Sequence, residues 1–151
     1  SSAASDVYKR QEEIRAYAAQ DSRIRFFGFL PHEEAVQLQK QATVLVNPRT
    51  NQGEYTKYSF PSKTMEYMAS GRPVMMFRLD GIPGEYDPFL TYIPEESSAS
   101  IRDTVESLRR LSPSELDAMG ARGRDFVLKN KNRNVQMRRV LDFIHKEQSD
   151  A

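Results

Sequence analysis

The sequence contains no cysteine and no tryptophan among its 151 residues, and it has only two histidines. Without cysteine there is no disulfide framework, no thiolate metal site and no thiol nucleophile. His32 and His145 stand alone, so no histidine cluster suggests a metal. The 22 basic residues nearly balance the 21 acidic ones, so no global field argues for nucleic acid. We therefore expect no metal, no cofactor and no nucleic-acid partner.

Long apolar runs are also missing. No stretch approaches the roughly 20 residues that span a bilayer, and no signal peptide opens the chain, so we predict a cytoplasmic protein. A local excess of basic residues allows peripheral contact with the inner face of a membrane. The segment from residue 120 to residue 139 contains seven basic residues and only one acidic residue, an Asp. The basic residues are Arg122, Arg124, Lys129, Lys131, Arg133, Arg138 and Arg139. The alternative is a solvated surface, since these positions spread over more than one helix face.

The length suits one domain. Residues 1–6 are small and polar and predict a disordered leader. Residues 7–145 form the expected domain, and residues 146–151 form a polar tail.

Helical and strand patterns alternate along this domain. Strands are predicted at Ile24–Leu30, Thr43–Val46, Val74–Phe77 and Leu90–Ile93. Helices are predicted at Val7–Gln20, from Pro31 onward, at 61–70, at Ser98–Leu111, from Ser112 onward, and at Val135–Ile144. In the helix that begins at Pro31, we expect Ala35, Val36 and Leu38 to face the core. Such alternation predicts an α/β fold with a doubly wound, mostly parallel sheet and flanking helices. Gly120 lies in a helix context, so its neighbourhood is not a dinucleotide fingerprint.

The most informative stretch is Pro61–Val74, PSKTMEYMASGRPV. Proline suits a first helical turn, and Gly71 followed by Pro73 stops a helix. Val74–Phe77 is a continuous apolar run, as expected for a strand that is covered on both faces. The stretch therefore predicts a short helix followed directly by a buried strand.

The start of this helix is a candidate phosphate site. A helix N-terminus offers unpaired N–H groups and a partial positive charge, and Ser62 and Lys63 add a hydroxyl and a cation. Glu66, one turn later, can accept two hydrogen bonds from a vicinal diol such as a ribose. Phosphate and diol one turn apart describe a nucleotide. The alternative is that Glu66 only favours the helix dipole and Lys63 is solvated.

A second candidate lies where the strand at Thr43–Val46 ends. Ligands of open α/β sheets bind beyond the carboxyl ends of strands, so Arg49 is placed to reach a phosphate or a sugar hydroxyl, unless it is a solvated loop residue. The loop at Thr50–Ser59 and the turn-rich segment Asp80–Glu85 are further candidates beside this edge.

The stretch Pro61–Val74 resembles the nucleotide-binding signature of the group 1 glycosyltransferases, retaining enzymes of the GT-B fold with nucleotide-sugar donors. The resemblance runs from about Ile24 to Ile144. Its weaker parts are RFFGFLPHEE at 25–34 and ATVLVNPR at 42–49, in the right order and spacing. It implies the C-terminal, Rossmann-like half of a GT-B fold.

The resemblance also implies roles for individual residues. The glutamate that matches Glu66 binds the donor ribose, and the turn that matches Ser62, Lys63 and Thr64 lies beside the donor diphosphate. Many members carry an earlier glutamate near the donor sugar. That position holds Tyr58 here, with Glu54 as a possible substitute.

Two strands that precede the one at Ile24–Leu30 in this family have no counterpart, so we expect an N-terminally truncated domain. In one version, Ile24–Leu30 pairs directly with Thr43–Val46, and in the other the first helix and strand pack loosely. The acceptor, a glycan or a lipid-linked molecule, would be bound by a missing N-terminal domain, and the chain alone would be inactive. The resemblance favours a UDP-sugar as donor substrate and a role in polysaccharide biosynthesis. The alternatives are a non-catalytic nucleotide-binding or interaction domain and a fragment of a GT-B sugar-nucleotide epimerase.

Overall fold

A computed structural model describes residues 2–51 and 62–131 of the chain. The chain divides into two compact units, Ser1–Ala35 and Val36–Ala151. None of the helices in the described ranges is long and apolar enough to cross a membrane.

The first unit contains α1 (Ser2–Gln20) and an extended segment that leads to α2 (His32–Gln41). Asp21 ends α1 by accepting hydrogen bonds from the backbone N–H and the guanidinium of Arg23. The Arg15 guanidinium lies 5.0 Å from the centre of the Phe26 ring. The apolar side chains of α1 remain largely exposed, as Tyr8 and Tyr17 show. The larger hydrophobic clusters of the described residues belong to the second unit.

The second unit is built on a parallel sheet, which in the described residues has the order β1-β2-β3. Its strands are β1 (Leu45–Asn47), β2 (Val74–Phe77) and β3 (Thr91–Ile93). β1 pairs with β2 from Leu45 opposite Val74, and β2 pairs with β3 from Met75 opposite Thr91. All four residues of β2 are buried, because this central strand is covered on both faces.

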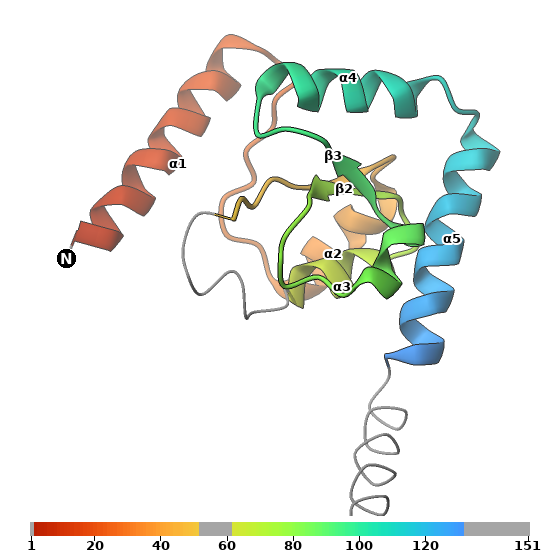
Figure 1. Cartoon of the computed structure of the whole chain (residues 1–151). Coiled ribbons are helices and arrows are strands. Elements are labelled where there is room, and N and C mark those ends of the chain that lie inside the picture. The colour runs from red at the N-terminus through yellow and green to blue at the C-terminus, as the bar shows by residue number, and fades with distance from the viewer. Residues whose placement is uncertain (1, 52–61, 132–151) are drawn as a thin grey trace, which may run out of the picture. The chain divides into compact units, whose positions relative to one another are not determined.

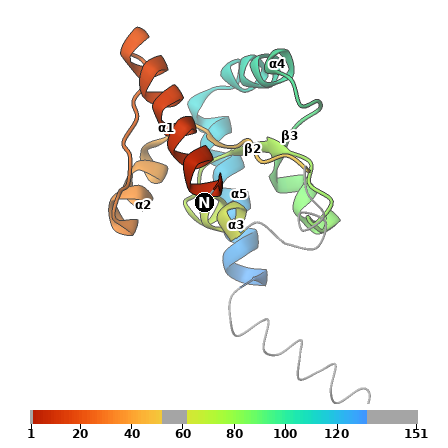
Figure 2. The ribbon, with the colours of Figure 1, turned by 90° about the vertical axis from the view of Figure 1, so that its left-hand side faces the viewer.

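Alternate residues of β2 enter two separate clusters, because successive strand side chains point to opposite faces. Val74 and Met76 pack with α3 (Ser62–Ala69), with the 3-10 helix η2 (Gly84–Phe89) and with Val127. Met75 and Phe77 pack on the other face with α4 (Ser98–Arg109) and with the start of α5 (Pro113–Asn130). In Figure 1, α4 accordingly lies above the strands and α3 below them, and Figure 2 shows the same order after a quarter turn.

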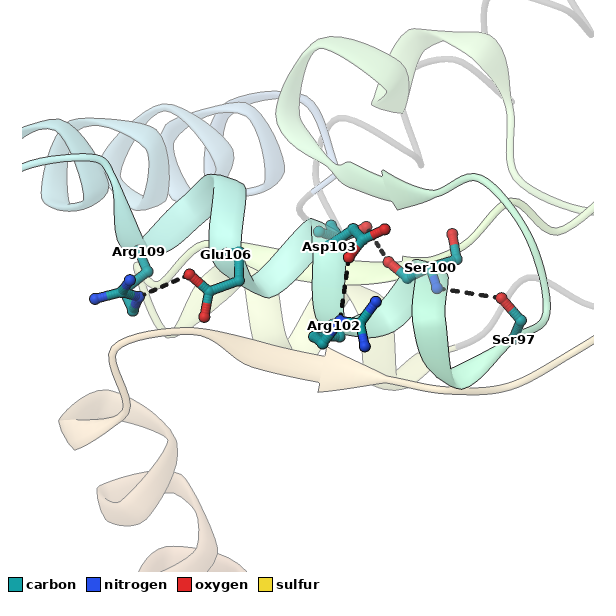
Figure 3. A network of polar contacts seen from close by, with 7 residues as sticks. Ser97, Ser100, Arg102, Asp103, Glu106 and Arg109 are labelled. Carbon is teal, nitrogen blue, oxygen red and sulfur yellow. Dashed lines mark hydrogen bonds and ion pairs between the residues drawn. The ribbon is translucent and has the colours of Figure 1, made fainter.

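The helices of the α4 layer begin with side-chain caps. The Ser97 hydroxyl accepts a hydrogen bond from the Ser100 N–H at 3.1 Å. Along the outer face of α4, Arg102 pairs with Asp103 and Arg109 pairs with Glu106 (Figure 3). α5 starts with a capping box, in which Ser112 and Glu115 bond to each other's backbone N–H. These local contacts explain why both helices were predictable from sequence.

Several predicted elements are confirmed, with small shifts in their bounds. β2 has the predicted bounds, β1 lies one to two residues later than expected, and β3 begins one residue late. Gly71 has φ +80°, as a helix stop requires. α1 includes residues 2–6, which the composition assigned to a leader. The predicted helix at Val135–Ile144 and the polar tail lie outside the described residues.

The prediction of a strand at Ile24–Leu30 is wrong. This segment is neither helix nor strand, and so it does not pair with Thr43–Val46. Gly28, at φ +65°, interrupts the extended backbone, and Phe29 is 97% exposed. The apolar residues of this segment resemble those of a strand, but no neighbouring strand in the described chain forms hydrogen bonds with its backbone N–H and C=O groups.

The inward face of α2 also differs from the prediction. Ala35 and Val36 are half-buried, but Leu38 is exposed and Gln39 is the buried residue. The apolar pattern predicted that Leu38 faces the core, but the polar side chain of Gln39 does so instead.

Candidate functional site

The candidate site lies at the start of α3, beside the end of β1. β1 ends at Asn47, and α3 begins at Ser62, so both ends meet at the carboxyl edge of the sheet. A hollow of about 110 Å³ lies there, lined by Asn47, Arg49, Ser62 and Lys63. The structure thus brings together three of the residues predicted from sequence, one from the strand end and two from the helix.

The electrostatics at this helix end favour an anion. The first turn of α3 contains no acidic residue, so the partial positive charge of the helix N-terminus is not neutralised there. Lys63 and Arg49 add two cationic side chains around the hollow. Ser62 is exposed and its hydroxyl stands at the first helical position. Backbone N–H groups, a hydroxyl and two cations suit a phosphate or diphosphate.

Glu66 lies one turn after the N-terminus of α3. Its side chain is 28% exposed. Its Oε1 accepts a hydrogen bond from Gln39 Nε2 at 2.6 Å, and Lys63 Nζ lies 3.3 Å and 3.5 Å from its two oxygens. The carboxylate is therefore held at the surface between a cation of its own helix and an amide from α2.

The side chain of Thr64 connects α3 to the sheet. The residue is fully buried. Its hydroxyl accepts from Asn47 Nδ2 at 3.4 Å and donates to Met76 Sδ at 3.8 Å. A ligand at the hollow could meet its backbone but not its hydroxyl. The interaction ties α3 to β1 and β2, and so it fixes the helix end beside the strand end.

The loops after β1 and β2 are joined at the same edge of the sheet. Asn51 donates to the carbonyl of Arg78 at 3.1 Å and accepts from the Asp80 N–H at 3.2 Å. Further on, Asp87 accepts a hydrogen bond from the Tyr92 hydroxyl at 2.8 Å and pairs with Arg78. These contacts order part of the candidate segment Asp80–Glu85, which sequence alone had only called turn-rich.

The remaining predictions divide by location. Glu54 and Tyr58 lie outside the described residues, as do Arg133, Arg138 and Arg139 of the basic stretch. Lys131 does not contribute to a basic surface, because its side chain is 7% exposed, pairs with Glu85 and lies over the Tyr86 and Phe126 rings. Lys129 is exposed and pairs with Asp125. Arg122 and Arg124 are exposed on α5.

Sequence reasoning missed Gln39 as part of this site. The available signal was a polar residue in an apolar helical stripe, since position 39 follows Ala35 by four residues and Val36 by three. Periodicity identifies the buried face, but it does not identify which distant carboxylate an amide on that face will meet.

A larger hollow lies on the opposite face of the sheet. It measures about 370 Å³ and is lined mainly by apolar side chains of β1, of α4, of α5 and of the residue before β1, among them Val44, Val46 and Leu108. Its polar lining consists of Thr43 and Arg109, and it contains no carboxylate such as that of Glu66.

Comparison with known proteins identifies a family for the chain. The group 1 glycosyl transferase family matches the chain over residues 4–110, which is more than two thirds of its length. No curated protein and no solved structure shows a significant match to the chain. The α/β architecture with a parallel sheet and flanking helices is that of a Rossmann-like half of a GT-B fold. The chain belongs to the group 1 glycosyl transferases.

Proposed function

We propose that this chain is the donor-binding domain of a retaining glycosyltransferase, which takes its sugar from a nucleotide-sugar, with a UDP-sugar favoured. The observation that carries the proposal is the order of chemical groups along α3. Two cations and a helix N-terminus surround the hollow at Ser62, and a carboxylate follows one turn later at Glu66. A nucleoside diphosphate presents its phosphates and its ribose diol in the same order.

In this proposal, the diphosphate lies in the hollow lined by Arg49, Ser62 and Lys63. It accepts hydrogen bonds from backbone N–H groups of the first turn of α3. Negative charge grows on the diphosphate as the sugar departs, and preorganised donors stabilise that charge without reorganising. Lys63, whose side chain is 61% exposed, can turn from Glu66 toward a phosphate oxygen.

Glu66 takes the ribose in the same proposal. An ionised carboxylate is an acceptor only, with two oxygens that suit the two hydroxyls of a diol. This contact orients the nucleotide rather than taking part in bond cleavage. A second domain of the GT-B type would hold the acceptor, a glycan or a lipid-linked molecule, so we expect this chain alone to bind its donor without transferring the sugar.

The test is a calorimetric titration of UDP, GDP and ADP into the chain and into its Glu66→Ala variant. We expect one nucleotide to bind selectively and the substitution to weaken it about tenfold or more, which is roughly 1.4 kcal/mol. Glu96→Ala serves as the matched control, because Glu96 is an exposed glutamate near the start of α4.

Each contrary outcome has a distinct meaning. Equal affinities in the wild-type and Glu66→Ala chains would contradict the ribose role and favour a non-catalytic nucleotide-binding domain. A folded chain that binds none of the three nucleotides would contradict donor binding by this domain.

A further inference from the structure

Gln39 is a polar residue in a buried position. It is 9% exposed and is the buried residue of α2. Burial of an amide is unfavourable unless both of its polar atoms are hydrogen-bonded. Within the described part of the chain, the Gln39 side-chain oxygen is buried without a hydrogen-bond partner. An apolar side chain of similar length would therefore pack here at lower cost, so packing alone does not account for glutamine.

The amide nitrogen of Gln39 does have a partner, and that partner is Glu66. Nε2 donates to the Glu66 Oε1 at 2.6 Å, across 27 positions of sequence. A carboxylate only accepts hydrogen bonds, so the amide must present its nitrogen to Glu66 and leave its oxygen on the other side. The unsatisfied oxygen is thus a consequence of the bond to Glu66.

α2 is fixed at the residue next to Gln39. The Arg72 Nε donates to the Lys40 carbonyl at 2.7 Å, one of the carbonyls that a helix end leaves unpaired. The same guanidinium pairs with Asp117 of α5 at 2.9 Å. Arg72 follows the turn that ends α3, so it holds the last turn of α2 against the helix that carries Glu66.

The Glu66 carboxylate consequently has donors from two directions. Lys63 approaches from within α3, and Gln39 approaches from α2. A glutamate side chain has several rotatable bonds, and ordering them when a ligand binds reduces affinity. A neutral amide orders the carboxylate without cancelling its charge, so the carboxylate stays a strong acceptor.

We propose that Gln39 is a positioning residue, which holds the Glu66 carboxylate in the orientation that receives the ribose diol of the nucleotide. This assignment rests on the proposed function, and it adds a determinant of ribose recognition from a helix that sequence motifs do not place at the site. Gln39 acts through Glu66 and does not itself touch the nucleotide.

The test compares a nucleotide with its counterpart that lacks the diol. The probes are the diphosphate, among UDP, GDP and ADP, that binds the wild-type chain most tightly, and its 2′,3′-dideoxy form. We expect the wild-type chain to prefer the ribose form about tenfold or more. Gln39→Met keeps the length of the side chain and removes the donor. We expect it to reduce this preference to threefold or less and to change the affinity for the dideoxy form less than twofold.

Gln37→Met is the matched control, because Gln37 is exposed on the same helix and receives the same substitution. Its preference should equal that of the wild-type chain. Glu66→Ala should abolish the preference, and adding Gln39→Met to it should have no further effect, since both act on one interaction.

A second variant, Gln39→Glu, guards against a folding defect in Gln39→Met. It places a carboxyl group against Glu66, and two carboxyl groups in contact share a proton. Lys63 is a cation that faces this pair. We expect the ribose preference to be lost at pH 8.5 and restored at pH 5.5, whereas the wild-type preference is the same at both values.

The outcomes separate the two proposals. A wild-type preference that survives in both folded Gln39 variants would overturn the role of Gln39 and leave donor binding intact. A wild-type chain with no preference for the ribose form would overturn the ribose role of Glu66, and the role of Gln39 with it.

Discussion

Tyr92 is a residue whose ionisation is strongly altered by the fold. Burial raises the pKa of Tyr92 to about 12, and the hydrogen bond from its hydroxyl to Asp87 acts in the same direction. The Arg78 guanidinium, 4.9 Å from the ring centre, opposes this shift only in part. The neutral phenol is therefore part of the folded state at the carboxyl edge of the sheet.

The raised pKa predicts a loss of stability in alkali. An unfolded tyrosine ionises near pH 10, so this contribution is complete below pH 10 and disappears as the pH rises toward about 12. Two pKa units correspond to about 2.7 kcal/mol, which we reduce to about 1 kcal/mol because Tyr92 is only half-buried. Urea unfolding at pH 8 to 11.5 should show the wild-type chain losing its advantage over Tyr92→Phe.

The control for this experiment is Tyr17→Phe, at a tyrosine that is 63% exposed. Its stability relative to the wild-type chain should stay constant over the same pH range. A difference between wild-type and Tyr92→Phe chains that is as large at pH 11.5 as at pH 8 would contradict the raised pKa.

Thr64 and Gln39 show what sequence could not predict at this scale. A threonine in a helix start is usually a surface residue, yet Thr64 is buried because its hydroxyl joins Asn47 and Met76. Gln39 is buried because its amide meets Glu66. Both roles depend on partners that are distant in sequence. By contrast, Glu66, Lys63 and Ser62 were identifiable because their chemistry depends on spacing within one helix.

At the scale of elements, α5 makes a close backbone contact with the turn that ends α3. A Cβ added to Gly120 would lie 2.1 Å from the Gly71 carbonyl oxygen and 2.8 Å from the Arg72 Cα. These are backbone atoms of the turn between α3 and β2, and the adjacent Pro73 carbonyl is bonded to the Leu45 N–H at 2.9 Å. The turn therefore has little room to move away.

This contact predicts opposite effects at two glycines of one helix. Gly120→Ala should lower the free energy of unfolding by about 2–3 kcal/mol, because overpacking against backbone cannot be relieved by a rotamer change. At Gly123, the nearest atom to an added Cβ lies at 3.7 Å, which is ordinary contact. Gly123→Ala should be neutral or stabilising by up to about 1 kcal/mol, because alanine favours helix. Urea unfolding of both variants measures the difference, and equal effects would contradict the close approach.

Element prediction succeeded where the determinants were local. β2 was identified by a buried apolar run between a helix stop and a polar turn, and α5 by its capping residues. Ile24–Leu30 has a comparable apolar composition, but a strand also needs a neighbour with which to form hydrogen bonds. The sheet of the described residues runs from β1 to β3 and does not include this segment. The composition of a segment indicates whether its side chains suit a strand, but it does not show whether another strand lies beside it.

At the scale of the whole molecule, the described part of the second unit places the β1-β2-β3 sheet between two apolar clusters. Val74 and Met76 of β2 enter one cluster, and Met75 and Phe77 enter the other. α5 contributes to both, through Val127 in the first and Leu116 in the second. The two clusters are thus joined by shared elements, while their side chains lie on opposite faces of the sheet.

This arrangement predicts that small cavities in different clusters have independent effects. Ile82 belongs to the first cluster and Ile93 to the second, and both are nearly fully buried. Ile82→Val and Ile93→Val should each lower the free energy of unfolding by about 0.5–1.5 kcal/mol. The double variant should equal their sum within about 0.5 kcal/mol, because the two residues belong to different clusters. Urea unfolding of the four chains gives the coupling energy.

A pair within one cluster provides the contrast. The Phe89 and Phe126 rings stack with centroids 4.4 Å apart, so Phe89→Leu and Phe126→Leu should couple by about 0.5–1.5 kcal/mol. Because α5 and β2 connect the two faces, both clusters should still unfold in a single transition, with coincident midpoints by circular dichroism and tyrosine fluorescence. Strong coupling between Ile82 and Ile93 would mean that strain crosses the sheet, and two separate transitions would mean that the faces fold independently.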